Sequence, residues 1–270
     1  MKKRNKIIIR LVSTLAVMLC VTGVTHIQAK NVYAKKTITM TTKSIPSEIK
    51  KYSNYNKYTK YTVAFNYYMK QLEKAGGGKF IIKKGTYEMS NSVYIPSNVQ
   101  VVLKNGVVLK NIYQTGGAGY PPSNNVFSLC PPSKSKIKGS CKKVSGAKNI
   151  SITGKGNATI DNNFVEGGGT IVISHNKNVK VSGITFKNQN GGHFLEITGV
   201  ENVVIENCTF KGSKASTRAK NYMKEAINLD TPDPETHGLN AVWVAQDRTD
   251  NKNITITNNV FDGVTRGVGT

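Results

Sequence analysis

The fold is decided by residues 178–186, which have the sequence NVKVSGITF. The same pattern, an asparagine followed by alternating apolar residues and a closing aromatic, returns at residues 202–210 and 253–261. Its opening half is also present at residues 98–101 and 149–152, so that the five asparagines are separated by 51, 29, 24 and 51 residues. A recurring period in the twenties is typical of a solenoid, in which each repeat buries its apolar face only against its neighbours.

These repeats predict an all-β solenoid with a strand in each Asn-led segment. Alternation along a strand places the Val, Ile, Leu and Phe side chains inside and points the intervening side chains outward. We interpret each gap of 51 residues as two coils of about 25 residues. Asparagine suits the tight bends where the strands begin, and we expect these side chains to stack into a ladder. Leucine-rich repeats have a similar period, but Val, Ile and Asn dominate here.

The N-terminal part of the repeat region begins with a different pattern. Residues 61–75 carry apolar side chains at helical spacing, and residues 76–78 are three glycines that end the helix. A strand at 79–82, the motif Gly85-Thr86-Tyr87 and a second apolar segment at 93–96 follow. This order of elements resembles the opening of the pectate-lyase-like superfamily.

The resemblance extends over residues 61–270 and implies a right-handed parallel β-helix with a short N-terminal capping helix. It also implies a groove along one sheet that holds an extended polysaccharide. Of the motifs of polygalacturonases, Asn228-Leu229-Asp230 resembles N-T-D, whereas the D-D pair and R-I-K are absent and Gly192-His193 precedes the acid. The resemblance therefore implies a fold and a polysaccharide ligand, and leaves the reaction open.

The sequence divides into three segments. Residues 1–34 have basic residues, an apolar run and small residues at Ala29 and Ala34, which is typical of a secretory signal peptide and predicts a secreted protein. Residues 35–60 are rich in Lys, Thr and Tyr without a clear period, and we interpret them as a basic arm or linker. The β-helix domain is expected at 61–270; because the chain stops within what resembles a new strand, we expect it to be incomplete at its C-terminal end.

The net charge of +23 bears on partners more than on fold. The first 34 residues hold six of the 38 bases and none of the 15 acids, which leaves 32 − 15 = +17 for the remainder. We expect an anionic polysaccharide partner and electrostatic association with a cell wall. Nucleic acid is not expected, because the chain is exported and has no interleaved basic and aromatic motif.

Export also bears on the cysteines. Cys130 and Cys141 flank a loop rich in Pro, Ser and Lys that a disulfide would close. Cys208 lies within an apolar repeat and is expected to be a small buried residue.

The candidate catalytic residues come from aligning the strands that lie between the Asn-led repeats. Leu195 then lies over Ile227, which points Glu196 and Asp230 outward on adjacent coils. Their backbones would be roughly 8 Å apart on the diagonal, which permits the geometry of an inverting glycosidase, with Asp230 as acid and Glu196 as base. Glu225 shares the inward parity of Ile227 and is not expected at the site.

Five further residues are candidates for the site. His193 follows two glycines on the face of Glu196, and His237 lies in the loop after Asp230; each is a candidate proton carrier or hydrogen-bonding group. Asn228 faces outward beside Asp230, and Trp243 offers a flat surface on which a sugar would stack. Arg266 aligns with His193 along the solenoid and would hold a substrate carboxylate.

Three functions fit these residues. The first is hydrolysis of a polysaccharide, most readily an acidic one, and it requires no cofactor. The second is a lyase acting on uronate polymers, in which Arg266, a lysine or a metal such as calcium neutralises the carboxylate. The third is a binding module or adhesin that contacts a cell wall or polysaccharide without catalysis.

Overall fold

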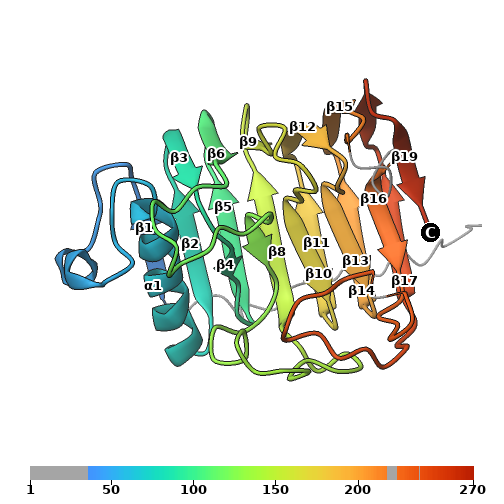
Figure 1. The fold of residues 1–270 in the computed structure, drawn as a ribbon, viewed down its shortest axis with the longest axis horizontal. Coiled ribbons are helices and arrows are strands. Elements are labelled where there is room, and N and C mark those ends of the chain that lie inside the picture. Colours follow the sequence, from blue (N-terminus) through green and yellow to red (C-terminus); the bar gives the residue numbers. More distant parts are fainter. Residues whose placement is uncertain (1–35, 218–223, 237) are drawn as a thin grey trace, which may run out of the picture.

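The chain forms a solenoid of three sheets wound around one apolar core (Figure 1). The computed structural model describes residues 36–217, 224–236 and 238–270. The predicted signal peptide and His237 lie outside these ranges. In the part that is described, the structure has no helix long and apolar enough to cross a membrane.

Each complete coil contributes one strand to each sheet, and β1 adds a further strand to the first sheet. The first sheet contains β1 (Thr37–Met40), β2 (Gly78–Ile82), β5 (Val99–Leu103), β8 (Lys148–Gly154), β11 (Lys177–Ser182), β14 (Glu201–Glu206) and β17 (Lys252–Thr257). The second contains β3 (Gly85–Met89), β6 (Val107–Asn111), β9 (Thr159–Asp161), β12 (Thr185–Asn190), β15 (Thr209–Lys214) and β18 (Val260–Asp262). The third contains β4 (Val93–Tyr94), β7 (Phe127–Ser128), β10 (Ile171–Ser174), β13 (Leu195–Thr198), β16 (Glu225–Asp230) and β19 (Arg266–Gly269).

The strands pair in parallel in all three sheets. Parallel pairing needs a crossover between neighbouring strands, and here the other two sides of the coil supply it. The predicted fold class, an all-β right-handed parallel β-helix with a capping helix, is confirmed.

Helix α1 (Lys60–Lys74) covers the first coil (Figure 1). Its buried face includes Phe65, Met69 and Leu72, and the Phe65 ring meets the Phe80 ring edge-on at 5.1 Å. The helix therefore shields the apolar end of the solenoid, as the spacing of apolar residues predicts.

The interpretation of residues 35–60 as an arm or linker is wrong. Strand β1 pairs with β2 and extends the first sheet by one strand, and Met40 is fully buried. The short 3-10 helix η1 (Ser47–Lys51) buries Ile49 in the same core. The segment is too short to show a period, but it supplies the apolar groups that complete the cap.

The predicted asparagine ladder is confirmed. Asn98, Asn149, Asn178, Asn202 and Asn253 all have φ between 55° and 61°, in the left-handed region that asparagine tolerates. The Nδ2 of each of the last four donates to the Oδ1 of the one before at 2.9–3.0 Å. The same side chains therefore permit the bend and join the coils.

The interpretation of each 51-residue gap as two coils is wrong. Strand β5 pairs directly with β8, and β14 pairs directly with β17, so each gap is a single coil enlarged by insertions. The longest insertions are residues 112–126, 129–147 and 231–251, and all three begin or end at strands of the third sheet. The loops thus gather around one face of the solenoid.

Candidate functional site

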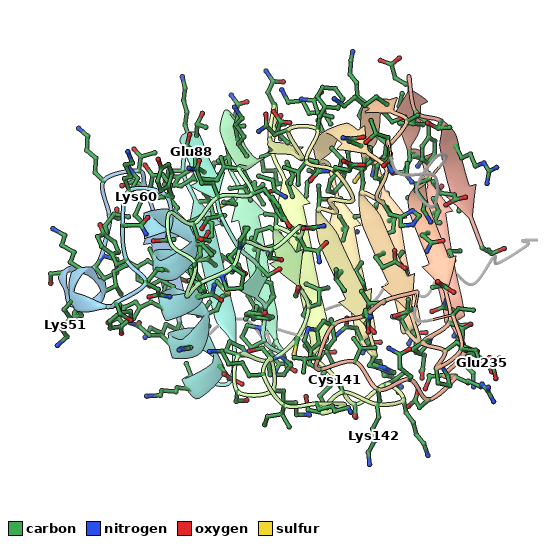
Figure 2. The ribbon with its side chains drawn as sticks, viewed as in Figure 1. Lys51, Lys60, Glu88, Cys141, Lys142 and Glu235 are labelled. Atoms are coloured by element: carbon green, nitrogen blue, oxygen red, sulfur yellow. The ribbon has the colours of Figure 1, made fainter. Side chains whose placement is uncertain are left out.

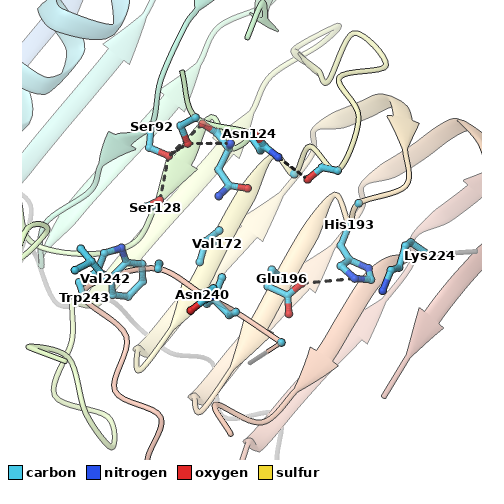
Figure 3. Close-up of a pocket in the computed structure, with 18 of the residues that line it drawn as sticks. Ser92, Asn124, Ser128, Val172, His193, Glu196, Lys224, Asn240, Val242 and Trp243 are labelled. Carbon is cyan, nitrogen blue, oxygen red and sulfur yellow. Dashed lines mark hydrogen bonds and ion pairs between the residues drawn. The ribbon is translucent and has the colours of Figure 1, made fainter. Parts of the chain in front are cut away.

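A groove of about 540 Å³ lies over the outer face of the third sheet (Figure 3). Its floor is one row of outward side chains, because the register places Tyr94 beside Ser128, Ser128 beside Val172, and Val172 beside Glu196. One wall comes from residues 238–243 of the long loop after β16. The opposite wall contains Asn124, Asn125 and four glycines at the turns before the strands of the third sheet.

Glu196 is the carboxylate of the groove floor. The predicted register is confirmed, with Leu195 paired to Ile227 and Glu196 to Asn228. Asn228 Nδ2 donates to Glu196 Oε1 at 2.9 Å, and only 12% of the Glu196 side chain is exposed. Burial raises the pKa of Glu196 to about 8, against the smaller opposing effect of the Asn228 hydrogen bond. The carboxyl group is therefore mainly protonated at neutral pH.

His193 lies beside Glu196 at the end of the groove (Figure 3). Its Nδ1 is 2.9 Å from the backbone oxygen of Glu225, so Nδ1 carries the hydrogen. Its Nε2 lies 3.7 Å from Glu196 Oε2. Burial lowers the pKa of His193, which keeps the imidazole neutral and leaves Nε2 as an acceptor facing the protonated carboxyl.

Glu225 does not line the groove, but its carboxylate contacts His193, which does. Its carboxylate lies 3.6 Å from His193 Nδ1 and 3.1 Å from an Arg266 guanidinium nitrogen. Burial alone would raise the pKa of Glu225, but its own backbone N–H, Arg266 and His193 together lower it.

Asp230 is on the predicted diagonal from Glu196, since it pairs with Thr198. It does not line the groove. Its Oδ1 accepts the backbone N–H of Thr231 at 2.7 Å, and its Oδ2 packs against Gly238, where no side chain would fit. The carboxylate thus holds the start of the loop after β16.

The three residues predicted to bind substrate have other partners. Trp243 does border the groove, but it is only 2% exposed and packs in a second apolar cluster with Cys130 and Cys141, so its ring offers no open face. Arg266 is bound to Glu225, and Asn228 is bound to Glu196. Asn228 consequently positions the carboxyl group and does not face the groove directly.

The disulfide predicted between Cys130 and Cys141 is not formed in the structure. Both are free, buried thiols whose Sγ atoms are 3.9 Å apart. A hydrogen bond from Cys130 lowers the pKa of Cys141 to about 7, and the same contact raises the pKa of Cys130. The pair lies under the loop after β16, because the backbone of Cys141 bonds to that of Trp243 at 2.9 Å. Cys208 is buried, as expected.

Several polar groups of the groove escaped prediction. Ser92 accepts a hydrogen bond from Ser128 at 3.2 Å and donates to the Asn125 carbonyl at 3.1 Å. Asn124 Nδ2 donates to the Gly167 carbonyl at 3.1 Å, which ties the two parts of one wall together. Aligning the short strands at 93–94 and 127–128 with β10 and β13 would have identified the floor residues, but two-residue strands have no period to align.

A group of three or more His, Cys, Asp or Glu side chains that could hold a metal ion is not found within 36–217, 224–236 and 238–270. The groove presents a protonated carboxyl group, a neutral imidazole, hydroxyl and amide groups, and Lys224 at its end. Such a lining can donate and accept hydrogen bonds along a chain of hydroxyl groups.

A parallel β-helix with a polar groove on one sheet is the class of protein that this fold and site define. The chain is 26% identical over 199 residues to plasmin and fibronectin-binding protein A of Streptococcus pneumoniae, a match that covers 69% of this chain and 26% of that protein. The chain thus spans about a quarter of the length of that relative. No family model matches the chain.

Two solved structures of PfbA, a surface adhesin of Streptococcus pneumoniae, are similar in fold. Each superposes with a TM-score of 0.57 at 22% identity. The first covers 73% of this chain and 44% of that chain, and the second covers 78% and 52%. At this identity the likeness extends to the fold alone.

Proposed function

We propose that the protein is an extracellular glycan-binding module whose groove over the third sheet holds a polysaccharide. The observation that carries this proposal is the floor row from Tyr94 to Glu196, walled by loops on both sides. A groove that crosses stacked coils matches the extended shape of a polysaccharide. Its hydroxyl and amide lining matches the hydroxyl groups of sugars without requiring a net charge.

The arrangement of carboxylates favours binding over hydrolysis. Hydrolysis by the usual route needs two carboxylates that flank the scissile bond, one protonated and one ionised. Among the described residues that line the groove, Glu196 is the one carboxylate. Asp230, its expected partner, is held by Thr231 and Gly238 in its own loop.

The relative supports a location and a class of function. Its printed name describes binding of plasmin and fibronectin, and its structures are described as those of a surface adhesin. The signal-like residues 1–34 and the high positive charge support an extracellular protein associated with a cell surface. We extend the adhesin class, and not the named partners, to this chain.

The experiment is a binding screen of the whole chain against uronic-acid polymers and neutral polysaccharides by isothermal titration calorimetry. We expect at least one glycan to bind, and Asn240→Ala and Glu196→Ala to weaken its binding about tenfold each, since both side chains line the groove. Glu88→Ala is the matched control, because Glu88 is exposed on β3 near the capped end, away from the groove (Figure 2). Failure of the wild-type chain to bind any glycan in the panel would overturn the proposal.

A second candidate, cleavage of a glycosidic bond, is favoured by the state of Glu196. A carboxyl group with a pKa of about 8 holds the proton that a departing sugar oxygen must receive. This reverses the roles expected from the sequence: Glu196 would be the acid, and Asp230, on the diagonal, would be the base that activates water. Release of reducing ends by the wild type, abolished in both Glu196→Gln and Asp230→Asn, would select this candidate. Unsaturated products absorbing in the ultraviolet would instead indicate a lyase.

A further inference from the structure

Two exposed aromatic side chains occupy corresponding places on consecutive coils. Tyr113 follows β6 and Phe164 follows β9. The last paired residues of these two strands are Lys110 and Asp161, and each aromatic residue lies three positions after its own. The side chains of Asn111 and Asn162, one residue past that rung, are also hydrogen-bonded at 3.3 Å. Tyr113 is 47% exposed and Phe164 is 39% exposed.

The backbone at both residues is in an unfavourable conformation. Their φ angles are 47° and 53°, in the left-handed region that bulky side chains avoid. Elsewhere in the described chain this conformation is taken mainly by glycine and asparagine; His175, which also adopts it, is buried with both ring nitrogens hydrogen-bonded. Tyr113 and Phe164 gain much less from burial. A strained backbone that presents aromatic rings to solvent points to a role in binding.

The turns that carry both residues are hydrogen-bonded to the wall of the groove. Asn111, two residues before Tyr113, donates through Nδ2 to the backbone oxygen of Asn124 at 2.8 Å. Phe164 lies in the same turn as Gly167, which accepts from Asn124 Nδ2 at 3.1 Å. Because Asn124 and Gly167 line the groove, the turns that carry Tyr113 and Phe164 adjoin its wall.

A lysine accompanies the rings. Lys214 Nζ lies 4.9 Å from the centre of the Phe164 ring, and Lys214 pairs in register with Asn190, whose Nδ2 donates to the Phe164 carbonyl at 3.0 Å. The nearby carboxylate of Glu166 accepts hydrogen bonds from the hydroxyl groups of Ser216 and Thr217. A flat aromatic face beside a cation suits a sugar ring that carries a negative group.

We propose that Tyr113, Phe164 and Lys214 form a rim subsite that stacks against a sugar ring of the bound glycan and prefers a ring bearing a carboxylate or sulfate. This inference rests on the proposed function, because the subsite extends the same groove. It also supplies the stacking surface that Trp243, packed among the cysteines, does not.

The test compares the binding of a hexasaccharide and a disaccharide of galacturonic acid, and of a neutral galactose hexasaccharide. Tyr113→Asn and Phe164→Asn keep a residue that accepts the left-handed backbone, so both variants should fold as well as the wild type. We expect each variant to bind the acidic hexasaccharide about tenfold more weakly than the wild type does. Binding of the disaccharide should be unchanged, because the short ligand fills only the groove. Lys214→Gln should remove the preference for the acidic over the neutral hexasaccharide.

Tyr52→Asn is the matched control, since Tyr52 is 41% exposed beside η1 at the capped end. Unchanged hexasaccharide binding in Tyr113→Asn and Phe164→Asn, together with weakened binding in Asn240→Ala, overturns the rim subsite and leaves the groove. Equal loss of hexasaccharide and disaccharide binding also overturns it, because the aromatics would then support the groove itself. Absence of any glycan binding by the wild type overturns the groove and the subsite together.

Discussion

The first and third sheets contain strands of the same coils, yet they differ in almost every other respect. The first sheet is a regular stack of strands, most of five to seven residues long, in which buried and more exposed side chains alternate. Its strands from β5 onward begin at the asparagine ladder. The third has strands of two to six residues, and its connections include insertions at 112–126, 129–147 and 231–251. The groove lies over the third sheet, and its titratable groups lie on the strands of that sheet or in the adjoining turns.

This difference separates stability from function within one repeat. Regular coils bury apolar groups and satisfy backbone hydrogen bonds, and neither task distinguishes one ligand from another. Irregular connections cannot add to a ladder, so they are free to place side chains around a ligand. Substitutions should therefore affect stability on the regular side and binding or pH response on the groove side.

The largest effect is expected for Phe210→Ala on the regular side. Phe210 is fully buried and stacks between Phe186 and Phe261, with ring centroids 5.1 Å away on each side. Removing the ring opens a cavity that links three coils, so the free energy of unfolding should fall by about 3–5 kcal/mol. Urea denaturation measures it, with the exposed Ile137→Ala as control. A loss as small as that of the control would show that the coils do not share one core.

On the groove side, Glu196 should make stability depend on pH. Its pKa is raised from 4.5 to about 8, so between these values the folded state holds a proton that the unfolded state has released. Stability is therefore complete below the unfolded pKa and falls as pH rises through the folded pKa, by about 3 kcal/mol between pH 5 and pH 7.5.

Glu196→Gln removes this titration and keeps the oxygen that Asn228 binds. The variant should consequently lose about 3 kcal/mol less than the wild type over that interval, as measured by urea denaturation at several pH values. Glu88→Gln, an exposed substitution of the same kind, should behave as the wild type does. Parallel curves for wild type and Glu196→Gln would contradict the burial of a protonated carboxyl group.

The same contrast explains what could be predicted from the sequence. The period, the ladder and the pairing of Leu195 with Ile227 followed from alternation, which holds wherever strands are regular. The contacts of Glu225 with His193 and of Asp230 with Gly238 did not follow from alternation, because His193 lies in a turn and Gly238 in a long loop, where parity carries no information. Trp243 was misplaced for a related reason: the loop folds back over Cys141, and that distant contact has no local signal.

The cysteine pair tests whether the groove wall can be fixed in place. Oxidised glutathione should convert the thiols of Cys130 and Cys141 into a disulfide, with loss of two hydrogens from the protein, because their sulfur atoms are already neighbours. Closing this short loop should add about 2–3 kcal/mol to the free energy of unfolding. Mass spectrometry under non-reducing conditions detects the disulfide as the loss of two hydrogens, and urea denaturation measures the gain in stability. Cys208→Ser should still form the bond and Cys141→Ser should not; wild-type protein that keeps both thiols after treatment would contradict the prediction.

The smallest effect that still separates the two sheets is expected in the asparagine ladder. Asn178 donates to Asn149 and accepts from Asn202, and its φ is 57°. Asn178→Ala loses both hydrogen bonds, and alanine tolerates the left-handed region less well than asparagine does. The free energy of unfolding should therefore fall by about 2 kcal/mol. Asn178→Gly loses the hydrogen bonds but relieves the backbone, and should cost about half as much. Urea denaturation distinguishes the two contributions.

Glycan affinity should stay at the wild-type value in both variants, because the asparagines lie where strands of the first sheet begin and none of their side chains lines the groove. Weaker binding in either variant would show that the regular side also shapes the site, and the separation between the sheets would not hold.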